Sequence, residues 1–179
     1  MQAIKFAMTD VRREIALSNA SHEPGGAKAL LKLGIEPGGG NFIAALGLLC
    51  YTEFGGLLKF NHRDARGRSI ASKNFNGFFD ELGPDYKAFR SKHNVYDVFR
   101  CGLAHEYYVK RTCSIAIRVV NSTTGIGIDL KGNYYFAVEQ YCNDLEKALL
   151  ALDRHLFPGG VGGSPRHGGV NLSCLLPPT

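Results

Sequence analysis

Apolar residues recur along most of this chain at the three- and four-residue spacing of amphipathic helices. In the first half, the spacing predicts a helix before a turn-rich break over residues 18–26, and a short helix over residues 27–33. The nearly continuous apolar run over residues 42–60 predicts a central buried helix with Asn41 as its N-cap. Gly55-Gly56 in that run would let another helix approach closely, or would weaken the helix there. The apolar face of the first helix consists of Ile4, Met8, Val11 and Ile15.

The second half of the chain carries three further helical patterns. Their spacing predicts a short helix from about Lys73 that ends at Gly83-Pro84, a helical stretch over residues 85–93, and a long final helix. The apolar faces of the first and last of these are Phe75, Phe78, Phe79 and Leu82, and Val138, Tyr141, Leu145, Leu149, Leu152 and Leu156.

Between these helices the apolar period changes to two. Cys113, Ile115, Ile117 and Val119 recur at every second position, and after a turn over residues 121–125 the same period returns at Ile126, Ile128 and Leu130. This pattern predicts that the two segments pair as an antiparallel hairpin, with a short third strand at residues 134–136. The fold class is therefore mainly α, with one helical domain over residues 1–157 and a small antiparallel β-hairpin inserted before the last long helix. Residues 158–179 are rich in Gly and Pro and predict a flexible C-terminal tail.

One predicted helix, over residues 96–110, carries the candidate chemistry. Its apolar stripe consists of Tyr96, Phe99, Leu103 and Tyr107. Arg100 and His105 are polar residues that lie next to this apolar stripe. A guanidinium stays charged at any physiological pH, whereas an imidazole titrates near neutrality. Together the two groups could face a phosphate, one holding charge and the other moving a proton.

Arg100, four intervening residues and His105, late in a helical chain, resemble the Arg-x4–6-His motif of the HEPN superfamily (higher eukaryotes and prokaryotes nucleotide-binding domains). The segment Phe-Arg-Cys-Gly-Leu-Ala-His-Glu-Tyr is especially similar to the motif segment of uncharacterised bacterial proteins of HEPN-like type. The resemblance implies a HEPN-like helical bundle that forms homodimers, in which motifs of two protomers build one metal-independent endoribonuclease site. Family members commonly carry a polar residue after the Arg, where this chain has Cys101, and this departure bears on catalysis more than on fold.

The motif predicts cleavage of single-stranded RNA by its own 2′-hydroxyl. Arg100 would bind the non-bridging phosphate oxygens and His105 would transfer the proton, and the resemblance implies a 2′,3′-cyclic phosphate product. We expect a second group of residues to support this pair: Glu53, Cys101, Glu106 and Tyr107. A carboxylate in the central helix needs a partner, so Glu53 either pairs with Arg100 or reaches the solvent edge.

The charge balance favours a polyanionic partner such as RNA or a nucleotide. Lys and Arg exceed Asp and Glu by 21 to 16, which gives a net charge of +5. We expect RNA contacts from a basic loop over residues 62–69 and from the end of the motif helix, although a basic loop is also a common solvated surface. The residues are Arg63, Arg66, Arg68, Lys110 and Arg111.

Other classes of function receive less support. The charged first twenty residues do not predict a secretory segment, and the apolar run over residues 42–51 falls short of the ~20 residues of a membrane span. Five cysteines without a CxxC pair predict reduced thiols and a cytoplasmic location. The histidines show no metal-binding spacing, so we expect no metal and no cofactor. Cys101 and His105 could form a nucleophilic dyad, but no third orienting residue accompanies them.

A non-catalytic HEPN-like module is the alternative function. It would bind a nucleotide, RNA or a partner protein, for example in a toxin–antitoxin or defence system. In that case Arg100 would pair with Glu53 and His105 would bond a backbone group, which makes the motif structural.

Overall fold

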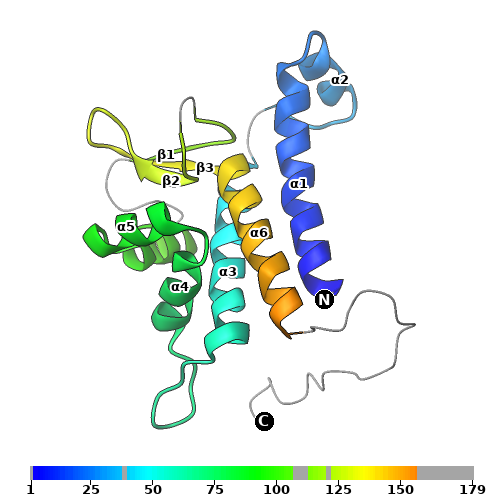
Figure 1. Ribbon diagram of the computed structural model, residues 1–179. Helices are drawn as coiled ribbons and strands as arrows, with labels where there is room; N and C mark the ends of the chain where they lie inside the picture. Colours follow the sequence, from blue (N-terminus) through cyan, green and yellow to red (C-terminus); the bar gives the residue numbers. More distant parts are fainter. Residues whose placement is uncertain (1, 38–39, 107–112, 120–121, 157–179) are drawn as a thin grey trace.

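The computed structural model describes residues 2–37, 40–106, 113–119 and 122–156, and this part of the chain is mainly helical with a small three-stranded sheet at one end (Figure 1). The fold class predicted from the sequence is therefore confirmed. The elements in chain order are α1 (Gln2–His22), α2 (Gly26–Lys32), α3 (Asn41–Phe60), α4 (Ala71–Asp80), α5 (Pro84–Lys92), η1 (Tyr96–Glu106), β1 (Cys113–Ala116), β2 (Ile126–Ile128), β3 (Tyr134–Ala137) and α6 (Val138–Leu156).

The apolar run predicted to be a buried helix is α3, which packs against α1, α4, α6 and η1. Its buried side includes Ala45, Leu48 and Leu49, each 0% exposed. Asn41 does not cap this helix as expected. Gly40 occupies the N-cap position at φ 72, a left-handed conformation that glycine adopts without steric cost. Asn41 is instead the first helical residue, and its Nδ2 donates to the carbonyl of Ile115 at 3.4 Å.

Helix α4 lies very close to the second half of α3. A Cβ built on Gly56 would come within 1.8 Å of the carbonyl oxygen of Asn74, so only glycine allows this approach. Phe75, Phe78 and Phe79 of α4 are at most 1% exposed and pack into the common core. The sequence prediction that this part of α3 admits a close helix is confirmed.

The first helix continues further than its sequence pattern indicated. A turn-rich break was expected from residue 18, but α1 extends to His22. The hydroxyl of Ser21 donates to the backbone carbonyl of Ser18 at 2.7 Å. This polar side chain therefore forms its hydrogen bond within the helix, and the backbone there stays helical. Met8, Val11 and Ile15 form the buried face of α1 as expected.

The strand pairing differs from the expected hairpin between the first two alternating segments. The sheet order is β1-β3-β2, with β1 parallel to β3 and β2 antiparallel to β3. The antiparallel hairpin is thus formed by β2 and β3, directly before α6. The turn between them is closed by Asp129, whose Oδ1 accepts from the backbone N–H groups of Lys131 (2.8 Å) and Asn133 (2.9 Å). This local turn fixes which strands are neighbours.

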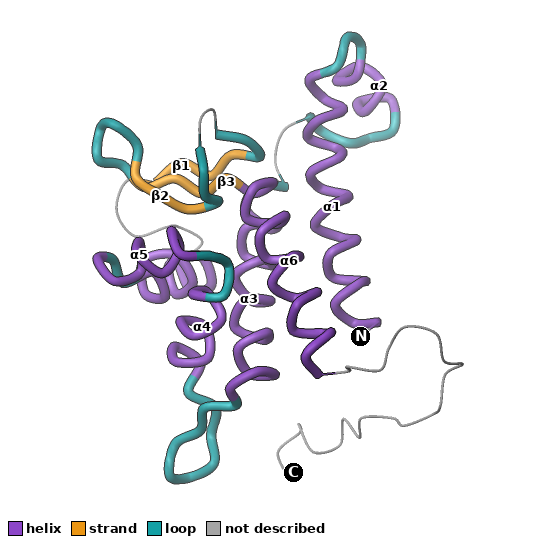
Figure 2. Tube along the Cα trace, viewed as in Figure 1, coloured by secondary structure: helices purple, strands orange, loops and turns teal. Residues whose placement is uncertain are grey.

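By length and composition α3 could cross a membrane, but the core helix of a soluble protein passes the same test. The helix lies at the centre of the described bundle (Figure 2), where it contacts α1, α4, α6 and η1. The predicted C-terminal tail, residues 158–179, lies outside the described residues.

Candidate functional site

The motif segment forms a π-helix, η1, and not the α-helix that its apolar stripe indicated. Phe99 and Leu103 of that stripe are 0% exposed, whereas Tyr96 is only partly buried. In an α-helix, residues five apart point about 140° away from each other. In a π-helix the hydrogen-bond ladder joins residue i to residue i+5, so five residues complete little more than one turn. The winding of η1 therefore brings the positions of Arg100 and His105 to the same side of the helix.

Arg100 forms an ion pair with Glu53 of the central helix. The Nε–H of Arg100 donates to Oε2 of Glu53 at 3.0 Å. The side chain of Arg100 is 19% exposed and that of Glu53 is 26% exposed, so the pair lies at the edge of the core. Of the two possibilities for Glu53, pairing with Arg100 is confirmed. The contact fixes the guanidinium against α3 through one edge and leaves the pair within reach of solvent.

His105 lies near the end of η1 and is exposed. Arg100, in contrast, is held against the core by Glu53. An anchored cation and an exposed imidazole on one helix are groups that could bind an anion and exchange a proton with it.

Three further side chains surround the ion pair. Tyr96 and Cys101 belong to η1, and Cys50 lies one turn before Glu53 on α3. Burial, followed by the negative charge of Glu53 and the thiol of Cys101, raises the pKa of the Tyr96 phenol. Burial also raises the pKa of the Cys50 thiol, and the nearby Arg100 acts in the opposite direction. Both groups are therefore neutral near pH 7.

The remaining predicted supporting residues are only partly covered by the structure. Glu106 is the last residue of η1, and its side chain lies outside the described part. The same is true of Tyr107, Lys110 and Arg111, which fall between the described ranges.

The predicted basic loop is an ordered turn held together by its own acidic residue. Oδ1 of Asp64 accepts from the backbone N–H groups of Arg66 and Arg68, and Oδ2 accepts from Nε of Arg68 at 2.8 Å. Nη1 of Arg63 donates to the carbonyl of Gly67 at 2.7 Å. These backbone hydrogen bonds lower the pKa of Asp64. Figure 2 shows the loop at the end of α3 that points away from the sheet.

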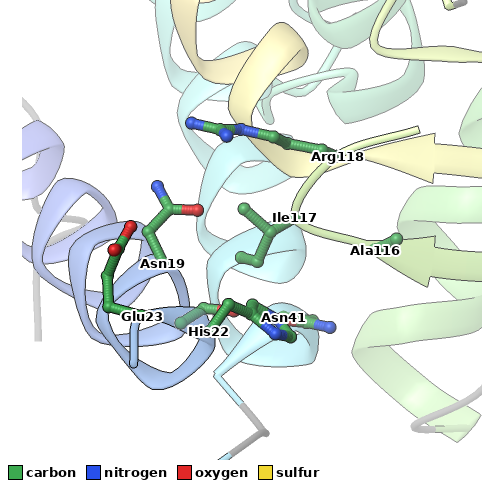
Figure 3. Close-up of a pocket in the computed structure, with 8 residues that line it drawn as sticks. Asn19, His22, Glu23, Asn41, Ala116, Ile117 and Arg118 are labelled. Atoms are coloured by element: carbon green, nitrogen blue, oxygen red, sulfur yellow. The ribbon is translucent and has the colours of Figure 1, made fainter. Parts of the chain in front are cut away.

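A hollow that the sequence did not indicate lies where α1, α3 and β1 meet. It has a volume of about 500 Å³, and none of the predicted site residues lines it. Asn19 of α1 and Glu23, the residue directly after α1, lie on one side of the hollow (Figure 3). Arg118 lies across another side, and Ile117 points into the space. These residues come from distant parts of the chain and carry no recognisable motif, so sequence reasoning had no signal for them.

Among the described residues, no group of three or more His, Cys, Asp or Glu side chains could hold a metal ion. Comparisons with models of protein families, with curated proteins and with solved structures gave no match to this chain.

Proposed function

We propose that the chain is a metal-independent endoribonuclease of HEPN type that acts on single-stranded RNA in the cytoplasm. The observation that supports the proposal is the π-helical winding of η1, in which residues five apart would lie on one side of the helix, together with the contact that anchors Arg100 to Glu53. π-helical segments are rare and are frequently found at functional sites.

The chemistry uses the nucleophile that RNA already contains. The 2′-hydroxyl oxygen attacks the adjacent phosphorus, the bond to the 5′-oxygen breaks, and the products end in a 2′,3′-cyclic phosphate and a 5′-hydroxyl. Glu53 engages the Nε edge of Arg100, and the terminal guanidinium nitrogens would fork onto the non-bridging oxygens as charge develops. His105 would remove the hydroxyl proton or donate one to the leaving oxygen.

A single Arg100–His105 pair does not readily supply both a general acid and a general base. The proposal therefore includes a two-fold homodimer in which His105 of a second copy provides the other proton-transfer group. The net charge of +5 supports an RNA substrate, because counterion release favours binding of cations to a phosphate backbone.

The second candidate is a non-catalytic module that binds a nucleotide, RNA or a partner protein. The burial of Arg100 favours it: a phosphate would have to share this guanidinium with a carboxylate only 3.0 Å away. In this case the ion pair serves to join η1 to α3, and Cys101 replaces a catalytic polar side chain.

Incubation of the purified protein with labelled single-stranded RNA in excess EDTA tests the proposal. We expect cleavage of RNA, no cleavage of the 2′-deoxy analogue, and a rate loss of at least about 100-fold for His105→Ala, since proton transfer is lost. His155→Ala is the matched control, because His155 is also exposed but lies in the last turn of α6. Arg100→Lys should also be inactive, because an ammonium does not reproduce the planar fork.

Cleavage that depends on Mg²⁺, or that survives His105→Ala, would reject the mechanism. An inactive wild type that still binds the labelled RNA would favour the non-catalytic module.

A further inference from the structure

An aromatic stack lies where α3 ends and the loop over residues 61–70 begins. The ring of His62 is nearly parallel to that of Phe60, with the planes 9° apart and the ring centroids separated by 5.8 Å. This is an offset-stacked geometry that aromatic pairs prefer. Phe60 packs closely against α4, because a Cβ added to Gly77 would come within 2.9 Å of its ring. His62 is exposed, so the imidazole face that is turned away from Phe60 is open to a further planar ring.

The backbone of His62 is fixed by a side chain of the core. Asn74 of α4 is 0% exposed, and its Oδ1 accepts from the N–H of His62 at 2.8 Å. Its Nδ2 donates to the carbonyl of His62 at 3.3 Å. The N–H of Ile70 donates to the same carbonyl at 2.9 Å, which joins the two ends of the loop. The position of the stack is therefore set by the helical bundle and not by the loop alone.

Arg63, the next residue, is held in place without losing its charge. Its Nε donates to Oδ1 of Asn61 at 2.9 Å, and its Nη1 donates to the carbonyl of Gly67 at 2.7 Å. Both acceptors are neutral, and no carboxylate of the described residues pairs with this guanidinium. The Nη2 group, which these two bonds do not use, can donate to a phosphate oxygen. A cation that is positioned in advance loses less side-chain entropy when it binds an anion.

The other charged residues leave the loop with a net positive charge. Arg68 pairs with Asp64 at 2.8 Å, and this pair is neutral as a whole. Arg66 is exposed, and its side chain has no carboxylate partner in the described part of the chain. Three arginines and one aspartate thus give residues 61–70 a charge of +2. Such an excess of cations favours a phosphate backbone, because its counterions are released on binding.

We infer that this loop binds single-stranded RNA, with an unpaired base stacked on His62 and a neighbouring phosphate bound by Arg63. A single strand presents both groups, whereas the bases of a duplex are already stacked and paired. An acidic polypeptide would use the arginines alone and would leave the exposed imidazole without a planar partner.

The loop lies within reach of the proposed cleavage site. Phe60 is seven residues, or about 10 Å, further along α3 than Glu53. A strand of a few nucleotides can therefore extend from the loop toward the Arg100–Glu53 pair. The choice of RNA rests on the proposed ribonuclease function, whereas the stacking and the charge are properties of the loop itself.

Fluorescence anisotropy with a labelled 2′-O-methyl oligoadenylate measures binding without cleavage, because this strand lacks the attacking hydroxyl. A companion strand has the same sugar–phosphate backbone without bases. We expect His62→Ala to raise the Kd of the oligoadenylate about tenfold and to leave the Kd of the abasic strand unchanged, since only a base can stack. His62→Phe should keep the Kd within about twofold of the wild type, because a benzene ring also stacks. His155→Ala, which removes another exposed imidazole, is the matched control and should have no effect.

Arg63→Gln tests the phosphate contact. It should raise the Kd of both strands and reduce the slope of log Kd against log salt concentration by about 0.7, the value for one phosphate on a single strand. Arg13→Gln removes an exposed cation from α1 and controls for net charge. It should leave the slope unchanged. Thermal unfolding of each variant shows that a lost affinity is not a lost fold.

The inference is overturned if the wild type does not bind the oligoadenylate, if His62→Ala leaves its Kd unchanged, or if His62→Ala weakens both strands equally. An equal loss of slope in Arg13→Gln and Arg63→Gln would reject the phosphate contact. The ribonuclease proposal fails separately. Binding with the expected variant effects, but without cleavage of unmodified RNA, would reject the ribonuclease and keep the loop as an RNA-binding surface.

Discussion

The contribution of the Arg100–Glu53 ion pair to stability depends on how far its two side chains are buried. Fully exposed pairs contribute about 0–1 kcal/mol, whereas removal of one partner of a fully buried pair costs about 3–5 kcal/mol. With side chains 19% and 26% exposed, this pair falls between the two limits. Solvent can partly rehydrate a carboxylate that loses its partner, and this reduces the cost.

We therefore expect Arg100→Ala to lower the free energy of unfolding by about 1–3 kcal/mol, since Glu53 then keeps a charge without its hydrogen-bond donor. Urea denaturation measures the change. Arg13→Ala is the control, because the Arg13 side chain is 64% exposed and its contacts to Asp10 and Glu14 are long, at 3.6 and 3.5 Å. The loss should stay within about 0.5 kcal/mol. Equal effects of the two substitutions would show that Glu53 does not depend on Arg100.

At the scale of elements, two of the three glycines of α3, Gly47 and Gly56, lie in contrasting surroundings. A Cβ on Gly47 would lie 3.8 Å from the side chain of Val11, an ordinary contact. A Cβ on Gly56 would collide with the backbone of Asn74 at 1.8 Å. Substitution by alanine at Gly47 therefore measures the effect of helix propensity, whereas the same substitution at Gly56 measures the effect of packing between α3 and α4.

Gly47→Ala should stabilise the protein by about 0.5–1 kcal/mol, because alanine loses less backbone entropy in a helix. Gly56→Ala should destabilise it by about 1–3 kcal/mol or more, because α4 must move away from α3. Urea denaturation of both variants measures the two effects. A stabilising Gly56→Ala would contradict the close approach of the two helices.

Sequence patterns predicted the helices well where one apolar face meets a single core, as for Leu48 of α3 and Tyr141 of α6. They did not predict the winding of η1, because the four-residue step from Phe99 to Leu103 is compatible with both an α- and a π-helix. Sequence patterns also did not predict that β1 pairs with β3, because the alternation around Ile115 is compatible with any neighbouring strand. The Arg100–Glu53 pair was one of two expected outcomes, because a buried carboxylate requires compensation.

At the scale of the whole molecule, the ribonuclease proposal requires two chains. We expect light scattering at micromolar concentration to give twice the 19.5 kDa mass of one chain. The physical reason is that acid and base must come from different copies of His105. A clean monomer would reject the composite site.

The strand order has a consequence for the folding pathway. β2 and β3 are neighbours along the chain and can close their hairpin on the order of microseconds. β1 precedes both of them but pairs with β3, so it adds to a hairpin that already exists and pays the entropy of closing a longer loop. We therefore expect β1 to dock late, after α6 has followed β3 out of the sheet. The hollow that β1 lines together with α1 then forms only in the final stage, so no ligand can occupy it before the rest of the domain has folded.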